Sequence, residues 1–166
     1  MKQIFITLLV ALTFFGCNSQ SEETKNITPK LVVGKSLSSL KLNDQNEKPQ
    51  TIPADTKIVF FSFSKPVGHM CNAFLESKPA DFLPKHHAVY IADVSPAPSL
   101  IKNMFILPDL KKLPFPILLI NDDNLSAAFT KGMDKKSIVV VTLENGTIKK
   151  IENVQDAKAL EARILQ

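Results

Sequence analysis

The sequence of 166 residues contains no tryptophan and only five glycines, one tyrosine and one arginine. Its few glycines form no Gly-rich phosphate loop, which excludes nucleotide binding of that kind. The formal net charge of +4 comes from lysines that are scattered or paired. Without a longer basic block these lysines are typical of a solvated surface, so we expect no nucleic-acid partner. No cofactor motif is present, and we expect no cofactor.

Cysteine is scarce as well, and the first of the two cysteines, Cys17, ends a leader-like segment. Lys2 precedes a largely apolar run at 4–15, which is shorter than the roughly 20 residues of a membrane-spanning helix and is typical of a signal peptide. The run ends in Phe-Phe-Gly-Cys, which resembles the lipobox of bacterial lipoproteins. This resemblance implies a lipoprotein signal peptide at 1–16 and an acylated Cys17; ordinary secretion is the alternative.

The lipobox resemblance also implies a location and a first partner. Cys17 would anchor the chain to a membrane of the bacterial cell envelope, facing the periplasm, and Asn18 favours the outer over the inner membrane. Residues 18–30 are polar without an apolar period, and 17–32 are interpreted as a lipid-anchored tether, followed by one domain at 33–166. Acylation of Cys17 would leave Cys71 without a disulfide partner in its own chain, although the compartment is oxidising.

The hydrophobic pattern of the domain predicts an α/β fold with a central mixed β-sheet flanked by helices. The run at 58–64 is interpreted as a central strand and 68–77 as the helix after it, with Cys71 at the corner between them. Further elements are expected as follows: an irregular N-terminal β-hairpin at 37–52, strands at 88–94 and 117–120, a helix from about 98 that Pro108 ends, a helix at 124–131, a hairpin at 137–151 around Asn145-Gly146, and a C-terminal helix at 156–165.

This order of elements resembles the thioredoxin-like superfamily, in its branch of peroxiredoxins (AhpC-TSA) and membrane-anchored thioredoxin-like proteins. The resemblance is carried by VVGKSLSSLKLNDQNEKPQTI, KIVFFSFS before Cys71, AVYIADVSPAPSLIKNMF, PFPILLINDDNLSAAFTKGM and IVVVTLENGTIKKI. It implies a thioredoxin-like fold with an N-terminal β-hairpin extension.

The family's active-site pattern is incomplete in this sequence. A thioredoxin-type site needs two cysteines separated by two residues, and Gly68 stands where the first would be if Cys71 is the second. The family's cis-proline would fall at 135–137, where there is none; whether Pro116 is cis is left open. The hydroxyl and proline positions of peroxiredoxins are Gly68 and Ser64, and the only arginine, Arg163, lies on the C-terminal helix. The resemblance therefore implies a redox-degenerate site.

Three interpretations of Cys71 remain: a buried inert thiol, a reactive single thiol and a metal ligand. His69, Met70 and Cys71 are ligand types that copper accepts, with His69 and Cys71 as weak metal candidates. Adjacent helical residues point in different directions, which favours ordinary packing roles.

Other candidate residues have equally ordinary explanations. His86 and His87 precede a strand and are expected on the surface. Asp93 and the pair Asp122-Asp123 follow strands, where they could bind a cation or serve in turns and helix caps.

The favoured function is a cell-envelope lipoprotein whose thioredoxin-like domain lacks the CxxC pair and has a non-catalytic binding or structural role toward an unidentified envelope protein. The first alternative is a thiol-disulfide oxidoreductase or peroxidase that uses Cys71. The second is a copper-binding accessory protein.

Overall fold

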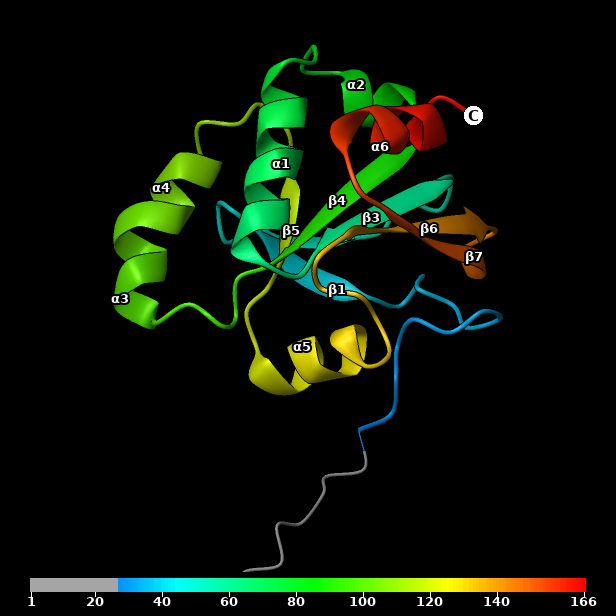
Figure 1. The fold of residues 1–166 in the computed structure, drawn as a ribbon, viewed down its shortest axis with the longest axis horizontal. Coiled ribbons are helices and arrows are strands. Elements are labelled where there is room, and N and C mark those ends of the chain that lie inside the picture. The colour runs from blue at the N-terminus through cyan, green and yellow to red at the C-terminus, as the bar shows by residue number, and fades with distance from the viewer. Residues whose placement is uncertain (1–26) are drawn as a thin grey trace, which may run out of the picture.

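A computed structural model describes residues 27–166; the expected signal peptide at 1–16, Cys17 and most of the expected tether lie outside them. The centre is a seven-stranded mixed sheet in the order β2-β1-β5-β4-β3-β6-β7 (Figure 1). Its strands are β1 (Lys41–Asp44), β2 (Pro49–Thr51), β3 (Ile58–Ser62), β4 (Ala88–Asp93), β5 (Ile117–Ile120), β6 (Ile138–Glu144) and β7 (Thr147–Val154). Strands β3, β4 and β5 are parallel, and the other pairs are antiparallel.

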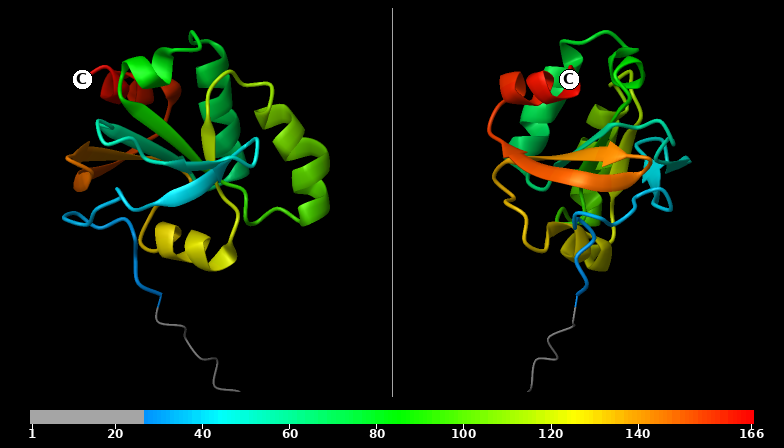
Figure 2. Two further views of the ribbon diagram at one scale, coloured as in Figure 1. Left: turned by 180° about the vertical axis from the view of Figure 1, so that it is seen from behind. Right: turned by 90° about the vertical axis from the view of Figure 1, so that its right-hand side faces the viewer.

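Helices cover both faces of this sheet. They are α1 (Lys65–Glu76), α2 (Phe82–Lys85), α3 (Ser99–Ile101), η1 (Lys102–Ile106, a π-helix), α4 (Leu107–Leu110), α5 (Asp123–Thr130) and α6 (Ala157–Ile164). Helices α1, α2, α4 and α6 pack on one face, and α5 packs on the other (Figure 2). None of the described helices is long and apolar enough to cross a membrane.

The all-buried sequence of β3 explains its central place. Because successive side chains of a strand point to opposite faces, Phe60 joins the cluster under α1 while Val59 and Phe61 join the cluster beside α5. A strand buried on both faces is a near-continuous apolar run, which is how the sequence located it.

Both expected hairpins are present. Asn145 and Gly146 have positive φ values of 50° and 72°, as the tight turn between β6 and β7 requires. In the N-terminal hairpin, β1 pairs with β2 and also with β5. The buried Gln45 after β1 accepts from the Ile117 N–H at 2.8 Å and donates to the Phe115 carbonyl at 2.6 Å, which ties the hairpin to β5.

The start of α1 differs from expectation. Helix α1 begins at Lys65 rather than 68, because Pro66 suits a first helical turn. Cys71 therefore lies inside the helix, and its expected place at a loop-to-helix corner is wrong.

Pro108 does not end the helix that precedes it, contrary to expectation. The chain continues from α3 through η1 into α4, where Pro108 occupies the first turn. The Leu107 N–H bonds the Lys102 carbonyl five residues earlier, a π-type bond. The short α2 was not expected at all.

The last residues of the expected tether belong to the packed domain. Leu31 is buried, and the Lys30 N–H bonds the Ala128 carbonyl of α5 at 2.9 Å. The Lys131 ammonium donates to the Ile27 carbonyl at 2.7 Å. The packed domain thus begins before residue 33, because long-range contacts with α5 outweigh the local polarity of this segment.

Candidate functional site

The candidate redox position lies at the carboxyl end of β3, where α1 begins. Cys71 is the seventh residue of α1, on the face that packs against the sheet, and its side chain is 0% exposed. Its surroundings include Val67 and Leu75 of the same helix and Phe60 and Tyr90 of the sheet, all buried. The thiol is thus in contact with the hydrophobic core rather than with solvent.

Cys71 ends a short buried polar chain. The Ser62 hydroxyl and the Tyr90 hydroxyl are hydrogen-bonded at 2.8 Å, and the Tyr90 hydroxyl also hydrogen-bonds the Cys71 thiol. Tyr90 in turn stacks on Phe60, with ring centroids 4.8 Å apart. This arrangement satisfies the polar atoms of all three residues within the core, as buried polar groups require.

The electrostatics of the chain favour its neutral form. Burial raises the pKa of the Cys71 thiol to about 12, although the Tyr90 hydrogen bond works in the opposite direction. Burial likewise raises the pKa of the Tyr90 hydroxyl well above its usual value. Because the thiolate is the nucleophile of thiol chemistry, a thiol with so high a pKa is almost entirely in its unreactive, protonated form at neutral pH.

This raised pKa predicts a pH dependence of stability. The folded chain keeps the Cys71 proton where the unfolded chain releases it, so stability is full below about pH 9 and falls as the pH rises toward 12. One retained proton corresponds to about 1.4 kcal/mol per pH unit. Urea unfolding at several alkaline pH values should show that the free energy of unfolding falls more steeply with pH for the parent chain than for Cys71→Ser, which keeps Tyr90 but lacks the thiol. Equal pH slopes for the two chains would contradict the raised pKa of Cys71.

The other positions that the resemblance to the thioredoxin-like superfamily singles out are Gly68, Arg163 and residues 135–137. Gly68 lies one turn before Cys71, and a Cβ there would meet only the Ser62 Oγ, at 3.6 Å. Arg163 belongs to α6, where it pairs with Glu152 of β7. Ser137 precedes β6 in the place of the family's cis-proline, and no peptide bond in residues 27–166 is cis, that of Pro116 included.

The structure does not bring the candidate copper ligands together. His69 is exposed, Met70 is partly buried against the core, and Cys71 is fully buried. His86 packs its ring against Phe82, with centroids 4.8 Å apart. Within residues 27–166, no group of three His, Cys, Asp or Glu side chains could hold a metal ion.

The remaining candidate residues have turn and capping roles. His87 has a positive φ of 51°, and its Nδ1 lies 2.8 Å from the Asp55 carboxylate. Asp93 accepts from the Ser95 N–H and hydroxyl and from the Ser126 hydroxyl. Asp122 caps α5 by accepting from the Leu125 N–H at 2.8 Å.

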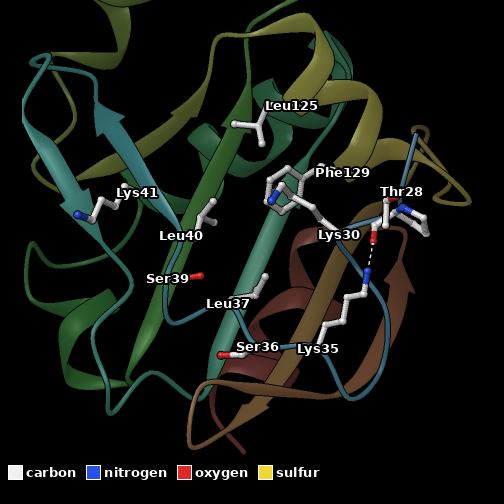
Figure 3. Close-up of a pocket in the computed structure, with 11 residues that line it drawn as sticks. Thr28, Lys30, Lys35, Ser36, Leu37, Ser39, Leu40, Lys41, Leu125 and Phe129 are labelled. Carbon is white, nitrogen blue, oxygen red and sulfur yellow. Dashed lines mark hydrogen bonds between the residues drawn. The ribbon is translucent and has the colours of Figure 1, made fainter. Parts of the chain in front are cut away.

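One surface feature was not predicted, a groove of about 490 Å³ between the N-terminal segment and α5 (Figure 3). Leu37, Leu40, Leu125 and Phe129 form its apolar floor, and lysines stand at its rim. Two of those lysines are already engaged within the groove: Lys30 lies over the Phe129 ring and Lys35 donates to the Pro29 carbonyl. Local sequence patterns could not have found it, because segments far apart in the chain form it.

Comparison with solved structures shows likeness in fold at low identity. The chain is similar to a protein assigned as thiol:disulfide interchange protein DsbE from Chlorobium tepidum, with a TM-score of 0.54, 14% identity, and coverage of 81% of this chain and 96% of that chain. It is also similar to the thioredoxin domain of a thiol-disulfide oxidoreductase from Bacteroides vulgatus, with a TM-score of 0.52, 11% identity, and coverage of 82% of this chain and 99% of that chain. For peroxidoxin BcpB from Mycobacterium tuberculosis the TM-score is 0.51 and the identity 12%, with coverage of 80% of this chain and 93% of that chain. No protein-family model and no curated protein matches the sequence.

Proposed function

The chain has the thioredoxin-like fold, and on that basis we propose that it is a lipid-anchored protein of the bacterial cell envelope whose domain binds an envelope partner without thiol catalysis. The observation that carries the proposal is the complete burial of Cys71, the one cysteine of the described chain. A thiol that is enclosed by the core and protonated to about pH 12 can neither meet a disulfide substrate nor attack it.

The surrounding residues also argue against the two enzymatic alternatives and the copper-binding one. An oxidoreductase of the CxxC type needs an accessible first thiol, and this position holds Gly68. A peroxidase with one cysteine needs a thiolate stabilised by a cation, and Arg163 is paired with Glu152 on another element. A copper site needs converging ligands, and His69 points to solvent while Cys71 points to the core.

The anchoring part of the proposal rests on the sequence. Cys17 lies outside the described residues, and its acylation is supported by the lipobox-like residues before it. We place the domain in the periplasm, on the outer rather than the inner membrane, because Asn18 follows Cys17.

The non-catalytic assignment predicts the labelling of Cys71 by a thiol reagent. In a Cys17→Ser background, the native chain should react with dithionitrobenzoate at neutral pH roughly a hundredfold more slowly than the denatured chain, because labelling requires local opening of α1. The same chain should not reduce insulin disulfides or consume hydrogen peroxide.

A matched variant supplies the rate for an accessible thiol. His69→Cys combined with Cys71→Ser places the thiol on the exposed side of the same helix and should react rapidly. Native Cys71 reacting as fast as this variant, or with an apparent pKa below about 8.5, would favour the enzyme instead.

A further inference from the structure

An exposed apolar surface lies on the helix that follows β4. Leu100, Ile101, Met104 and Phe105 are 67%, 42%, 58% and 56% exposed. They are four of the six exposed large hydrophobic residues in the described chain, gathered within two turns of one helix. Single exposed hydrophobic residues are normal in proteins, whereas such a cluster marks an interaction surface. We call these four residues the α3 face.

The α3 face points away from the body, as the burial along the helix shows. Ile106 and Leu107 are partly buried against the core and Leu110 is buried in it, whereas none of residues 99–105 is buried. Lys102 is half-buried and its ammonium donates to the Asn121 side chain, so this side of the helix is turned toward the body while the α3 face is on the outside. Figure 1 shows α3 at the outer edge of the molecule.

The α3 face and the segment that leads toward Cys17 lie on either side of α5 (Figure 1). The Lys131 ammonium holds the Ile27 carbonyl at one end of α5, and Lys102 contacts Asn121 beside the other end. Helix α5 has eight residues, which corresponds to a length of about 12 Å. The ten residues from 17 to 26 span at most about 35 Å. An anchor at Cys17 therefore keeps the α3 face within reach of the bilayer.

The composition of the helix also suits a bilayer surface. From Ser99 to Lys112 the chain carries three lysines and one aspartate, and the apolar side chains are long aliphatic groups and a phenylalanine. An apolar face next to lysines is the pattern of helices that lie in the interface of anionic membranes. Lys111 and Lys112 are exposed at the end of this helix. Lys112 pairs with Asp109 at 2.7 Å, and Lys111 can approach lipid phosphates.

We propose that the α3 face docks onto the anionic phospholipid bilayer that holds the lipid anchor. This inference rests on the proposed anchoring at Cys17. Docking adds a second contact to the anchor, which orients the domain with α3 toward the lipid and leaves α6 and the C-terminus facing away (Figure 1).

The absence of tryptophan allows a specific test. Phe105→Trp introduces a single fluorophore into the α3 face, and Leu165→Trp introduces one at an exposed position on the far side, at the end of α6. Each chain, residues 18–166 with an N-terminal polyhistidine tag, is held by a nickel-chelating lipid on vesicles of phosphatidylethanolamine and phosphatidylglycerol. Tethering then does not depend on acylation. Brominated acyl chains should quench about half of the Phe105→Trp emission and almost none of the Leu165→Trp emission.

Further arms separate the outcomes. Adding Leu100→Asp and Met104→Asp to Phe105→Trp should remove the quenching, with circular dichroism confirming that the fold is intact. Equal quenching at both tryptophans, or none at either, overturns the docking. Emission that is already shielded from acrylamide without vesicles, in a chain that sediments as a dimer, overturns it in favour of a second copy. Membrane flotation of the full-length chain against Cys17→Ser tests the anchor separately.

Discussion

Replacing Gly68 with cysteine should create a dithiol that closes to a disulfide with Cys71. The two residues lie three positions apart on α1, which places their Cα atoms about 5 Å apart, within the range of disulfides. The side chain fits, because a Cβ at this position meets only the Ser62 Oγ. Residue 68 is also partly exposed and near the helix N-terminus, which lowers the pKa of a thiol.

The measurement is a thiol titration in denaturant after treatment with oxidised glutathione. In a Cys17→Ser background, Gly68→Cys should lose both thiols without retaining glutathione, and it should reduce insulin disulfides where the parent chain does not. The control is His69→Cys, whose side chain lies on the opposite face from Cys71; it should keep a glutathione adduct. A stable glutathione adduct on Gly68→Cys would show that Cys71 cannot be reached even from its own helix.

Replacing Phe60 with alanine should remove much of the stability of the domain. Phe60 is 0% exposed in the central strand and stacks on Tyr90. Truncation of a fully buried phenylalanine costs about 3–5 kcal/mol, because the removed atoms lose their contacts and leave a cavity. The free energy of unfolding of a whole domain is typically about 5–15 kcal/mol, so the urea concentration at the unfolding midpoint should fall sharply.

Phe105→Ala is the matched control, since it deletes the same atoms from a side chain that is 56% exposed. Its free energy of unfolding should stay within about 0.5 kcal/mol of the parent value. Similar losses for the two variants would mean that Phe105 is covered in solution, and would contradict its exposed position.

The strands were predicted well because their signals are local. The run at 117–120 has the same bounds as β5, and Asn145-Gly146 forms the expected turn. A buried parallel strand must be apolar along its length, and a tight hairpin turn needs residues that accept positive φ. Both requirements can be read from a few neighbouring residues.

The errors concern features that depend on distant contacts. Pro108 was expected to end a helix, but the helix continues past it as α4, in which Leu110 is buried. Leu31 lies in a segment that reads as tether, yet it packs into the core beside α5. Neither contact can be predicted from the hydrophobic pattern of the neighbouring residues.

The sequence alone determined the order of strands and helices of the thioredoxin-like fold and the residues that stand at positions 68 and 71, because hydrophobic period and residue identity are properties of the chain itself. The tertiary structure decided whether Cys71 and the residues of the α3 face are buried or exposed. Cys71 could have been a surface nucleophile, and it is a core thiol because it lies on the face of α1 that packs against the sheet, near Tyr90. The α3 face likewise could have been core, and it is exposed because no other element of the described chain packs over it. Burial depends on what packs opposite a side chain, and only the folded chain supplies that.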